Sequence, residues 1–212
     1  MEFLKKVFGE KKAEKSQNEN KKQQLAELYR ECRRCTACEL AQQKVGIVHP
    51  TGNPYGKIMF ITAKPLNRNE RNFLMKALER EKILPKDYFV TNIVKCYIKR
   101  AVIPDLDTVK ACAPMLKKEV EIVKPSIVVA LGIETMKLLM GSDKPVPKSV
   151  RGKLVTVGDG SPVFAKETRI FNTYYPAYVM NNPGVAQLFA SDTGRLKSML
   201  EIVVSGSLVA VD

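Results

Sequence analysis

The chain has 212 residues, of which 45% are hydrophobic and 27% are charged, a composition typical of a globular protein with a buried core. Its 35 Lys and Arg against 22 Asp and Glu give a net charge of +13, which favours a polyanionic partner such as a nucleic acid; a charge that only serves solubility is the alternative. No segment reaches the roughly 18 to 20 uninterrupted apolar residues of a membrane span, and the first residues lack the apolar region of a signal peptide. We therefore expect a cytoplasmic protein that does not bind a membrane, in a bacterium, an archaeon or the host cell of a virus.

Residues 1–24 are expected to form a flexible, basic N-terminal arm. Residues 9–24 contain no apolar residue except Ala13, so they cannot bury enough surface for a fixed fold and are at most loosely helical. Four apolar residues near the start recur at helical spacing, namely Phe3, Leu4, Val7 and Phe8. This stripe is either a docking peptide for a partner protein or a helix that packs on its own domain.

Regular apolar patterning from residue 25 onward predicts one folded domain over residues 25–203, followed by a tail over residues 204–212. Apolar runs of strand length lie at Lys57–Thr62, Tyr88–Val94, Ser126–Leu131, Leu154–Val157 and Arg169–Tyr174. Helical spacing predicts helices that begin near Leu25 and lie at Asn69–Glu81, through Val109–Val123, at Glu134–Met140 and at Val185–Val203.

Apolar strands that alternate with helices predict an α/β fold, a three-layer α/β/α sandwich around a central, mainly parallel sheet. In such sheets ligands bind beyond the carboxyl ends of the strands. The residues that follow each predicted strand are therefore the first candidates for a functional site.

Four of the five cysteines have a spacing that suggests one metal centre. Cys35 and Cys38 form a Cys-x-x-Cys pair, and fifteen residues separate Cys96 from Cys112. A Cys₄ zinc site normally pairs two short Cys-x₂₋₄-Cys motifs, whereas an iron–sulfur cluster accepts wider spacing. Zinc stays an alternative, as do unrelated buried thiols. Cys32 also forms a Cys-x-x-Cys pair with Cys35 and competes for the first position.

Six segments that follow one another along the chain carry a family resemblance. They are CTACEL (35–40), GNPYGKIMFI (52–61), VTNIVKC (90–96), KPSIVVALG (124–132), VRGK (150–153) and YPAYVMNNP (175–183). Together they resemble the iron–sulfur, family-4 type of uracil-DNA glycosylases, over about residues 35–200. The resemblance implies removal of uracil from DNA and a structural [4Fe–4S] cluster on Cys35, Cys38, Cys96 and Cys112, and it leaves Cys32 outside the ligand set.

Uracil excision needs particular groups, since cleavage of the N-glycosidic bond builds positive charge on the deoxyribose and negative charge on the departing base. A carboxylate stabilises the first charge and a hydrogen-bond donor the second. The base is also flipped out, stacked on an aromatic ring and read along its edge. Glycosylases of family 4 meet these needs with a glutamate after the first strand, a phenylalanine soon after it, an asparagine after the next strand and a late histidine.

Three of these four groups are replaced or missing here. Ala63 stands at the position of the glutamate, and Tyr175 stands at the position of the histidine. The segment that would supply the phenylalanine is absent, because the chain passes from Leu66 directly into the predicted helix. Asn92 is retained, either as a reader of a base or as an amide that satisfies backbone groups at the strand end.

Two further residues have competing interpretations. Glu70 is either a displaced catalytic carboxylate or an acid that complements the dipole at a helix start. His49 does not match the histidine of the family and is interpreted as a loop residue.

The sequence supports three hypotheses about function. The favoured one is an iron–sulfur uracil-DNA glycosylase-like protein that binds single- or double-stranded DNA without normal glycosylase activity and acts in replication or repair with a partner protein. The second is an active glycosylase for uracil or another damaged base with a rearranged pocket, and the third is an interaction protein that recruits a partner through its arm and tail. The candidate DNA-contacting residues lie near strand ends, with solvated surface charge as the alternative: Lys64, Arg68, Lys99, Arg100, Arg151 and Lys153.

Overall fold

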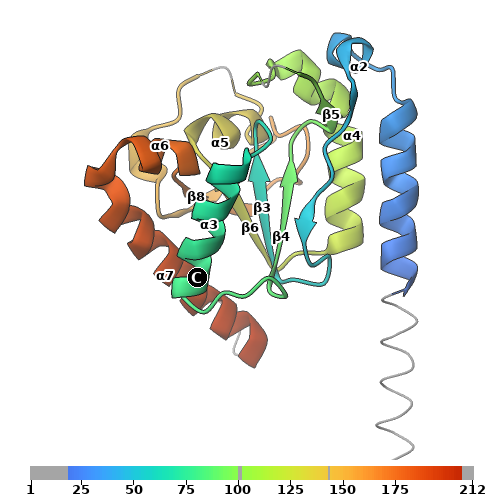
Figure 1. Cartoon of the computed structure of the whole chain (residues 1–212). Coiled ribbons are helices and arrows are strands. Elements are labelled where there is room, and N and C mark those ends of the chain that lie inside the picture. Colours follow the sequence, from blue (N-terminus) through green and yellow to red (C-terminus); the bar gives the residue numbers. More distant parts are fainter. Residues whose placement is uncertain (1–18, 100–101, 143, 207–212) are drawn as a thin grey trace, which may run out of the picture.

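The computed structural model describes residues 19–99, 102–142 and 144–206 (Figure 1). Its centre is a six-stranded sheet in the order β2-β4-β3-β6-β8-β7. The four inner strands are parallel, and the two edge strands are antiparallel to their neighbours. The strands are β2 (Thr51–Gly52), β4 (Tyr88–Asn92), β3 (Ile58–Thr62), β6 (Ile127–Leu131), β8 (Arg169–Thr173) and β7 (Leu154–Thr156). The mainly parallel sheet that the apolar runs predict is confirmed.

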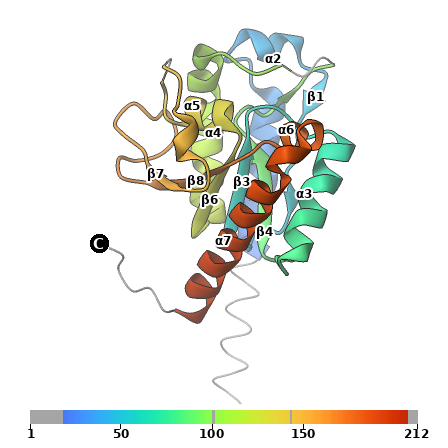
Figure 2. The same ribbon diagram turned by 90° about the vertical axis from the view of Figure 1, so that its left-hand side faces the viewer.

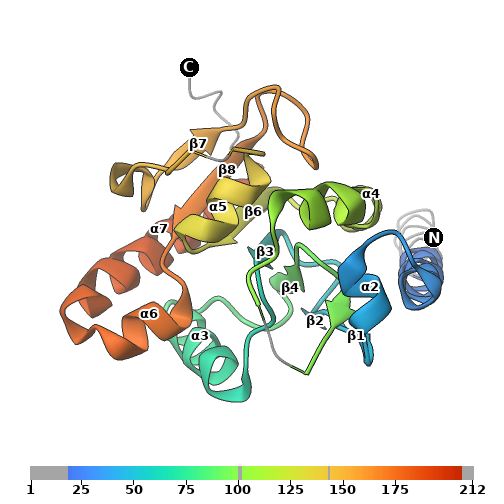
Figure 3. The same ribbon diagram turned by 90° about the horizontal axis from the view of Figure 1, so that it is seen from above.

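Helices cover both faces of this sheet (Figure 3). One layer holds the helix over residues 19–34, α4 (Leu106–Val123) and α5 (Ile133–Leu139), and the other holds α3 (Arg68–Arg80), α6 (Pro176–Asn181) and α7 (Ala186–Ser205). In Figure 2, α7 runs along the outside of the second layer. A short helix, α2 (Glu39–Gln43), and two 3₁₀ turns, η1 (Lys148–Val150) and η2 (Pro183–Val185), complete the described fold. The predicted three-layer α/β/α sandwich is confirmed.

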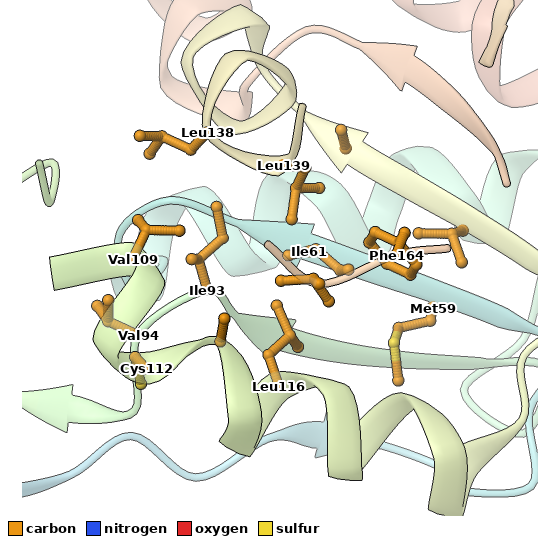
Figure 4. Packing of buried hydrophobic residues seen from close by; sticks show 14 of the residues in the cluster. Met59, Ile61, Ile93, Val94, Val109, Cys112, Leu116, Leu138, Leu139 and Phe164 are labelled. Atoms are coloured by element: carbon orange, nitrogen blue, oxygen red, sulfur yellow. The ribbon is translucent and has the colours of Figure 1, made fainter. Parts of the chain in front are cut away.

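The two layers follow from the alternation of side chains along the buried strands. In β3, Met59 and Ile61 pack into the core against α4 and α5 (Figure 4), while Ile58 and Phe60 pack on the opposite side against α3 and α7. Every residue of β3 is buried. A strand covered on both faces therefore reads as a continuous apolar run, which is why the sequence indicates it so clearly.

A second, two-stranded sheet pairs β1 (Gly46–Ile47) with β5 (Cys96–Tyr97) in antiparallel register. The sequence analysis did not predict this sheet, because two residues are too few to show a periodic pattern. The pairing brings the segment after the Cys-x-x-Cys turn against Cys96. It thus joins parts of the chain that lie about fifty residues apart.

Several boundaries differ from the predicted ones. The first helix is already formed at residue 19, so residues 19–24, which the sequence analysis assigned to the arm, are helical. Lys21 accounts for part of this extension, since its Nζ donates a hydrogen bond to the carbonyl oxygen of Val123 at 2.9 Å. The helix α6 was not predicted; it starts at Pro176, whose fixed φ suits the first helical position. None of the helices described above combines the length and the apolar character that a transmembrane span requires.

Candidate functional site

A cavity of about 460 Å³ lies beyond the carboxyl ends of β3, β6 and β8. Its walls come from the residues that follow β3, from the start of α5, from the turn before β7 and from the segment between Asn172 and Tyr178. This is the position at which a parallel α/β sheet binds ligands, as the strand pattern predicts. Ala63, Lys64, Arg151 and Tyr175 from the sequence analysis all line this cavity.

Gly132 allows the ends of β6 and β8 to approach each other at the cavity wall. Its backbone has φ +95° and ψ 155°, a conformation that is essentially restricted to glycine. A Cβ atom at this position would lie 3.0 Å from the Cβ of Tyr175, and the Gly132 amide donates to the Thr173 carbonyl at 2.8 Å. The turn thereby fixes the position of Tyr175 relative to α5.

Tyr175 donates its hydroxyl group to Glu70 Oε2 at 2.8 Å. Burial, followed by this hydrogen bond, raises the pKa of Tyr175 above its usual value. The ammonium group of Lys64 lies 5.3 Å from the centre of the Tyr175 ring. The phenol is therefore neutral and held by a protein carboxylate, instead of offering its hydrogen to the cavity.

Glu70 is a helix-capping residue. Its Oε2 accepts a hydrogen bond from the backbone N–H of Asn67 at 2.8 Å, and the Asn67 side chain accepts one from the Glu70 backbone at 2.9 Å. These two bonds form a capping box at the start of α3. Of the two interpretations of Glu70, the helix-start role is confirmed, and the same carboxylate also accepts from Tyr175.

Ala63 is buried, and its backbone N–H donates to Thr135 Oγ1 at 3.0 Å. The Thr135 hydroxyl in turn donates to the Leu131 carbonyl at 2.7 Å, which ties the end of β3 to the first turn of α5. Within the described part of the chain, the acidic residue that lines the cavity is Glu134. The sequence analysis missed this residue because it belongs to a predicted helix and not to a strand end.

Asn92 does not line the cavity that Ala63 and Tyr175 share, as far as the described residues go. Its side-chain amide donates to Thr62 Oγ1 at 2.5 Å, and its backbone carbonyl accepts from Lys95 Nζ at 2.8 Å. Asn92 is buried between the ends of β3 and β4. Asn92 thus lies beside Thr62, next to Ala63, but it is not among the described residues that line the cavity.

Asn172 lines the cavity and was not singled out by the sequence. It is 2% exposed, and its side-chain Nδ2 finds no hydrogen-bond partner among the described residues. The signal available in the sequence was an amide directly after the apolar residues Ile170 and Phe171 of a predicted strand. Since buried polar groups in proteins are nearly always paired, this donor is an exception among the described residues.

Arg151 is held in place by the fold at the edge of the cavity. Its guanidinium forms an ion pair with the fully buried Asp192 at 2.7 Å and lies 5.4 Å from the centre of the Tyr174 ring. Asp192 also accepts from the Thr173 hydroxyl at 2.7 Å. Arg151 therefore combines a structural role with its position at the cavity.

The other candidate DNA-contacting residues are distributed more widely. Lys64 is half-buried at the cavity, where the exposed Lys148, which the sequence analysis did not select, joins it. Arg68, Lys99 and Lys153 are exposed and belong to other parts of the surface. Arg100 lies outside the described residues.

Three parts of the fold carry the four cysteines of the candidate metal centre. Cys35 and Cys38 lie in the turn before α2, Cys96 begins β5 and Cys112 lies in α4. Burial, and after it the neighbouring charge of Cys112, raises the pKa of Cys96 to about 11, and Cys38 and Cys35 act in the same direction. Burial also raises the pKa of Cys32 to about 11, with Cys112, Cys35 and Cys96 among its charged neighbours. The thiols thus lie near enough to influence one another.

The donor chemistry of this group fits an iron–sulfur cluster, since four thiolates are the usual ligands of a [4Fe–4S] centre. Over the described residues, no three His, Cys, Asp or Glu side chains are grouped closely enough to hold a single metal ion. The thiolates of a cubane bind four different iron atoms, so they stand further apart than the ligands of one ion. His49, interpreted as a loop residue, is confirmed in the exposed loop between β1 and β2, with its ring 5.6 Å from that of Tyr29.

The chain is similar to known uracil-DNA glycosylases. A family model described as the uracil DNA glycosylase superfamily matches residues 45–193. The chain is 28% identical over 210 residues to a type-4 uracil-DNA glycosylase of Sulfurisphaera tokodaii, covering 89% of each protein. It is 28% identical to one of Saccharolobus solfataricus, over 80% of this chain and 83% of that protein, and 24% identical to one of Thermotoga maritima, over 85% and 97%.

Proposed function

Because this chain belongs to the uracil-DNA glycosylase superfamily, we propose that it is an iron–sulfur, DNA-binding protein of DNA repair or replication that does not excise uracil at an ordinary glycosylase rate. The observation that carries this proposal is the hydrogen bond between Tyr175 and Glu70. It occupies the donor that would have to stabilise a departing uracil anion. Ala63 supplies no carboxylate at the same cavity.

The missing carboxylate at Ala63 and the occupied donor at Tyr175 together predict a large loss of activity. Removal of one preorganised electrostatic group from an active site commonly costs about 2.7 to 4 kcal/mol of transition-state stabilisation. Two independent losses, at Ala63 and Tyr175, would slow excision by roughly 10⁴ or more. The connection between β3 and α3 consists of residues 63–67 and contains no aromatic residue, so it offers no ring on which a flipped uracil could stack.

An excision assay on uracil-containing single-stranded DNA tests the proposal directly. We expect the cluster-loaded protein to release no uracil above background, even when the substrate is in large excess over the enzyme and the incubation is long. Repeated turnover would overturn it. The double variant Ala63→Glu, Tyr175→His should recover weak excision at best, because the stacking segment is still absent, and full recovery would contradict our account of the pocket.

The second candidate, an active glycosylase with a rearranged pocket, is favoured by Glu134. This carboxylate lines the same cavity as Ala63 and is the natural substitute for the missing glutamate. If the wild-type protein excises uracil or another base, Glu134→Gln should abolish that activity. If it excises nothing, affinity for plain single-stranded and duplex DNA decides between a DNA-binding protein and an interaction protein that recruits a partner without DNA.

We propose Cys35, Cys38, Cys96 and Cys112 as the cluster ligands. The cluster, when bound, supplies a structural crosslink between the first turn, β5 and α4. We expect protein purified under low oxygen to be brown, with about four iron and four sulfide per chain. Cys112→Ser should lose colour and stability, whereas Cys32→Ser, the matched control at the remaining buried cysteine, should keep both. Zinc in place of iron in a colourless, stable protein would refute the assignment.

A further inference from the structure

We infer that a groove between the C-terminal half of α7 and the segment that joins α3 to β4 docks a peptide of a partner protein, in which acidic side chains flank apolar ones. This inference goes beyond the proposed function and does not depend on it. The groove has a volume of about 460 Å³ and is lined by residues of the segment 82–87 and by one side of α7 between Lys197 and Ser205. Since this segment leads into the start of β4, the groove lies at the opposite end of the sheet from the cavity (Figure 1). A partner bound there leaves the cavity open.

Apolar side chains form the floor and part of the walls of the groove. Leu200 is buried, whereas Leu84 is 42% exposed and Val204 is 68% exposed. Exposed apolar residues that stand singly are common on protein surfaces, but these two line the same hollow. One apolar side chain of a partner can therefore cover both and remove their apolar surface from water, which is the main favourable contribution to most protein–protein association.

The cations at the groove define the charge of the partner. Two carboxylates line the groove, and both are already engaged: Asp87 accepts a hydrogen bond from a backbone N–H of its own segment at 2.8 Å, and Glu201 pairs with Lys197 at 3.4 Å. Lys82 and Lys86 are exposed, and neither ammonium group has an ion-pair partner among the described residues. Two unpaired positive charges beside an apolar hollow complement a peptide whose acidic side chains flank an apolar one.

Lys82 occupies a backbone position that favours glycine. It follows the last turn of α3 with φ +57°, in the left-handed region. Its N–H donates to the Glu79 carbonyl at 2.9 Å, and the N–H of Ile83 donates to the Leu78 carbonyl at 2.9 Å. These two bonds form the Schellman pattern of a helix end, in which glycine is the usual residue at this position. The helix end therefore does not require a lysine for its stability, whereas the lysine side chain lines the groove.

Fluorescence anisotropy of a labelled peptide, DELDDLE, titrated with the full-length protein tests the inference. We expect Lys82→Gly to weaken the binding about threefold, since one charge pair at the surface is lost, while the melting temperature does not fall. Val204→Asp, which places a negative charge in the apolar hollow, should weaken the binding at least about tenfold. The matched control is Lys124→Gly, at an exposed lysine that also has a positive φ, 51°, at a helix end but lies outside the groove. This control should bind the peptide as the wild type does.

Two further peptides show which features of the partner the groove reads. DESDDSE, which lacks the apolar side chains, and KKLKKLK, which reverses the charge, should each bind at least about tenfold more weakly than DELDDLE. No binding of DELDDLE, or equal affinity of the wild type and both variants, would overturn the inference, as would equal affinity for DESDDSE. Full displacement of the peptide by a single strand of twelve thymidines would overturn it by assigning the lysines to DNA. A dimer that Val204→Asp dissociates in sedimentation velocity, without any peptide binding, would overturn it by assigning the groove to a second copy of this chain.

Discussion

Tyr175 shows how one substitution changes the chemistry of a pocket. An imidazole at this position can carry a positive charge, whereas a phenol can only donate one hydrogen bond. In this protein that hydrogen bond goes to Glu70, the residue that also caps α3. The side chain that faces the cavity is thus coupled to the stability of α3.

Replacement of Tyr175 by phenylalanine should lower the free energy of unfolding by about 1 to 2 kcal/mol, because a hydrogen bond to a carboxylate is lost. Urea denaturation measures the change. Tyr178→Phe, at an exposed ring for which the structure records only stacking, should have no comparable effect.

The difference in unfolding free energy between wild type and Tyr175→Phe should depend on pH, and the pKa of Tyr175 gives the direction of this dependence. Since burial and Glu70 raise the pKa of Tyr175 in the folded state, the neutral phenol stabilises the fold. This contribution is complete below the pKa of an unfolded tyrosine, about 10, and is lost as the pH rises toward the higher folded value. The stability difference between wild type and Tyr175→Phe should be constant from pH 6 to 9 and should shrink above about pH 10. A difference that grows above that pH would contradict the assigned direction.

Gly132 is the residue at which backbone conformation limits substitution most clearly. Alanine there would adopt a conformation reserved for glycine and would press against Tyr175. We expect Gly132→Ala to lower the free energy of unfolding by about 1 to 3 kcal/mol. Gly184→Ala is the control, since a Cβ at that position meets none of the described residues within 4 Å, and its effect should stay within about 0.5 kcal/mol.

At the scale of the elements, a buried ion pair joins α4 to the segment that follows β4. Lys95, 2% exposed, donates to the fully buried Glu119 of α4 at 2.5 Å. Glu119 also accepts from Thr91 at the end of β4, at 2.7 Å, and from the hydroxyl of Tyr29 in the helix over residues 19–34. One carboxylate therefore holds together three segments that are distant in the sequence.

Removal of Lys95 alone should lower the free energy of unfolding more than removal of both charges of the Lys95–Glu119 pair. Lys95→Met leaves the Glu119 carboxylate buried without its cation, for which about 3 to 5 kcal/mol of lost stability is typical. Adding Glu119→Gln should restore part of this loss, because the uncharged amide can accept from one of the two hydroxyl groups, of Tyr29 and Thr91, and donate to the other. Urea denaturation measures the stability of both variants. A double variant less stable than Lys95→Met would contradict this account.

The elements that could be predicted are those with long, uniform patterns. The apolar run of β3 and the amphipathic pattern of α3 gave boundaries within one residue of the observed ones. By contrast, β1 and β5 consist of two residues each, and α6 depends on Pro176 within a stretch that resembles a loop. Such elements are determined by tertiary contacts and not by local preference.

The candidate site was predictable in position but not in detail. The predicted parallel sheet located it beyond the carboxyl ends of the strands, and Ala63, Tyr175 and Arg151 were found there. Asn92 was grouped with them through resemblance, yet its hydrogen bond to Thr62 turns it away from the cavity. Asn172 was missed because the lack of a partner is a property of the folded surroundings.

For the molecule as a whole, the net charge of +13 predicts strongly salt-dependent binding to DNA. Lys64→Ala with Lys148→Ala should reduce the slope of log affinity against log salt concentration by about 1.4 for a single strand, because two phosphate contacts are lost. Filter binding at several salt concentrations measures the slope. Lys57→Ala with Lys86→Ala is the matched control, since these exposed residues precede β3 and β4 at the opposite edge of the sheet, and an equal effect there would argue against a localised site.

The helix over residues 19–34 has a geometric consequence for any use of the N-terminus. Its first turns lie at the edge of the sheet opposite the cavity, where Lys21 reaches the carbonyl of Val123, and its last turn leads into the cysteine segment (Figure 1). At 1.5 Å per residue, this helix separates the two ends by about 24 Å. A fluorophore attached at residue 19 itself would therefore lie on the far side of the molecule from the cavity and would leave the cavity unobstructed.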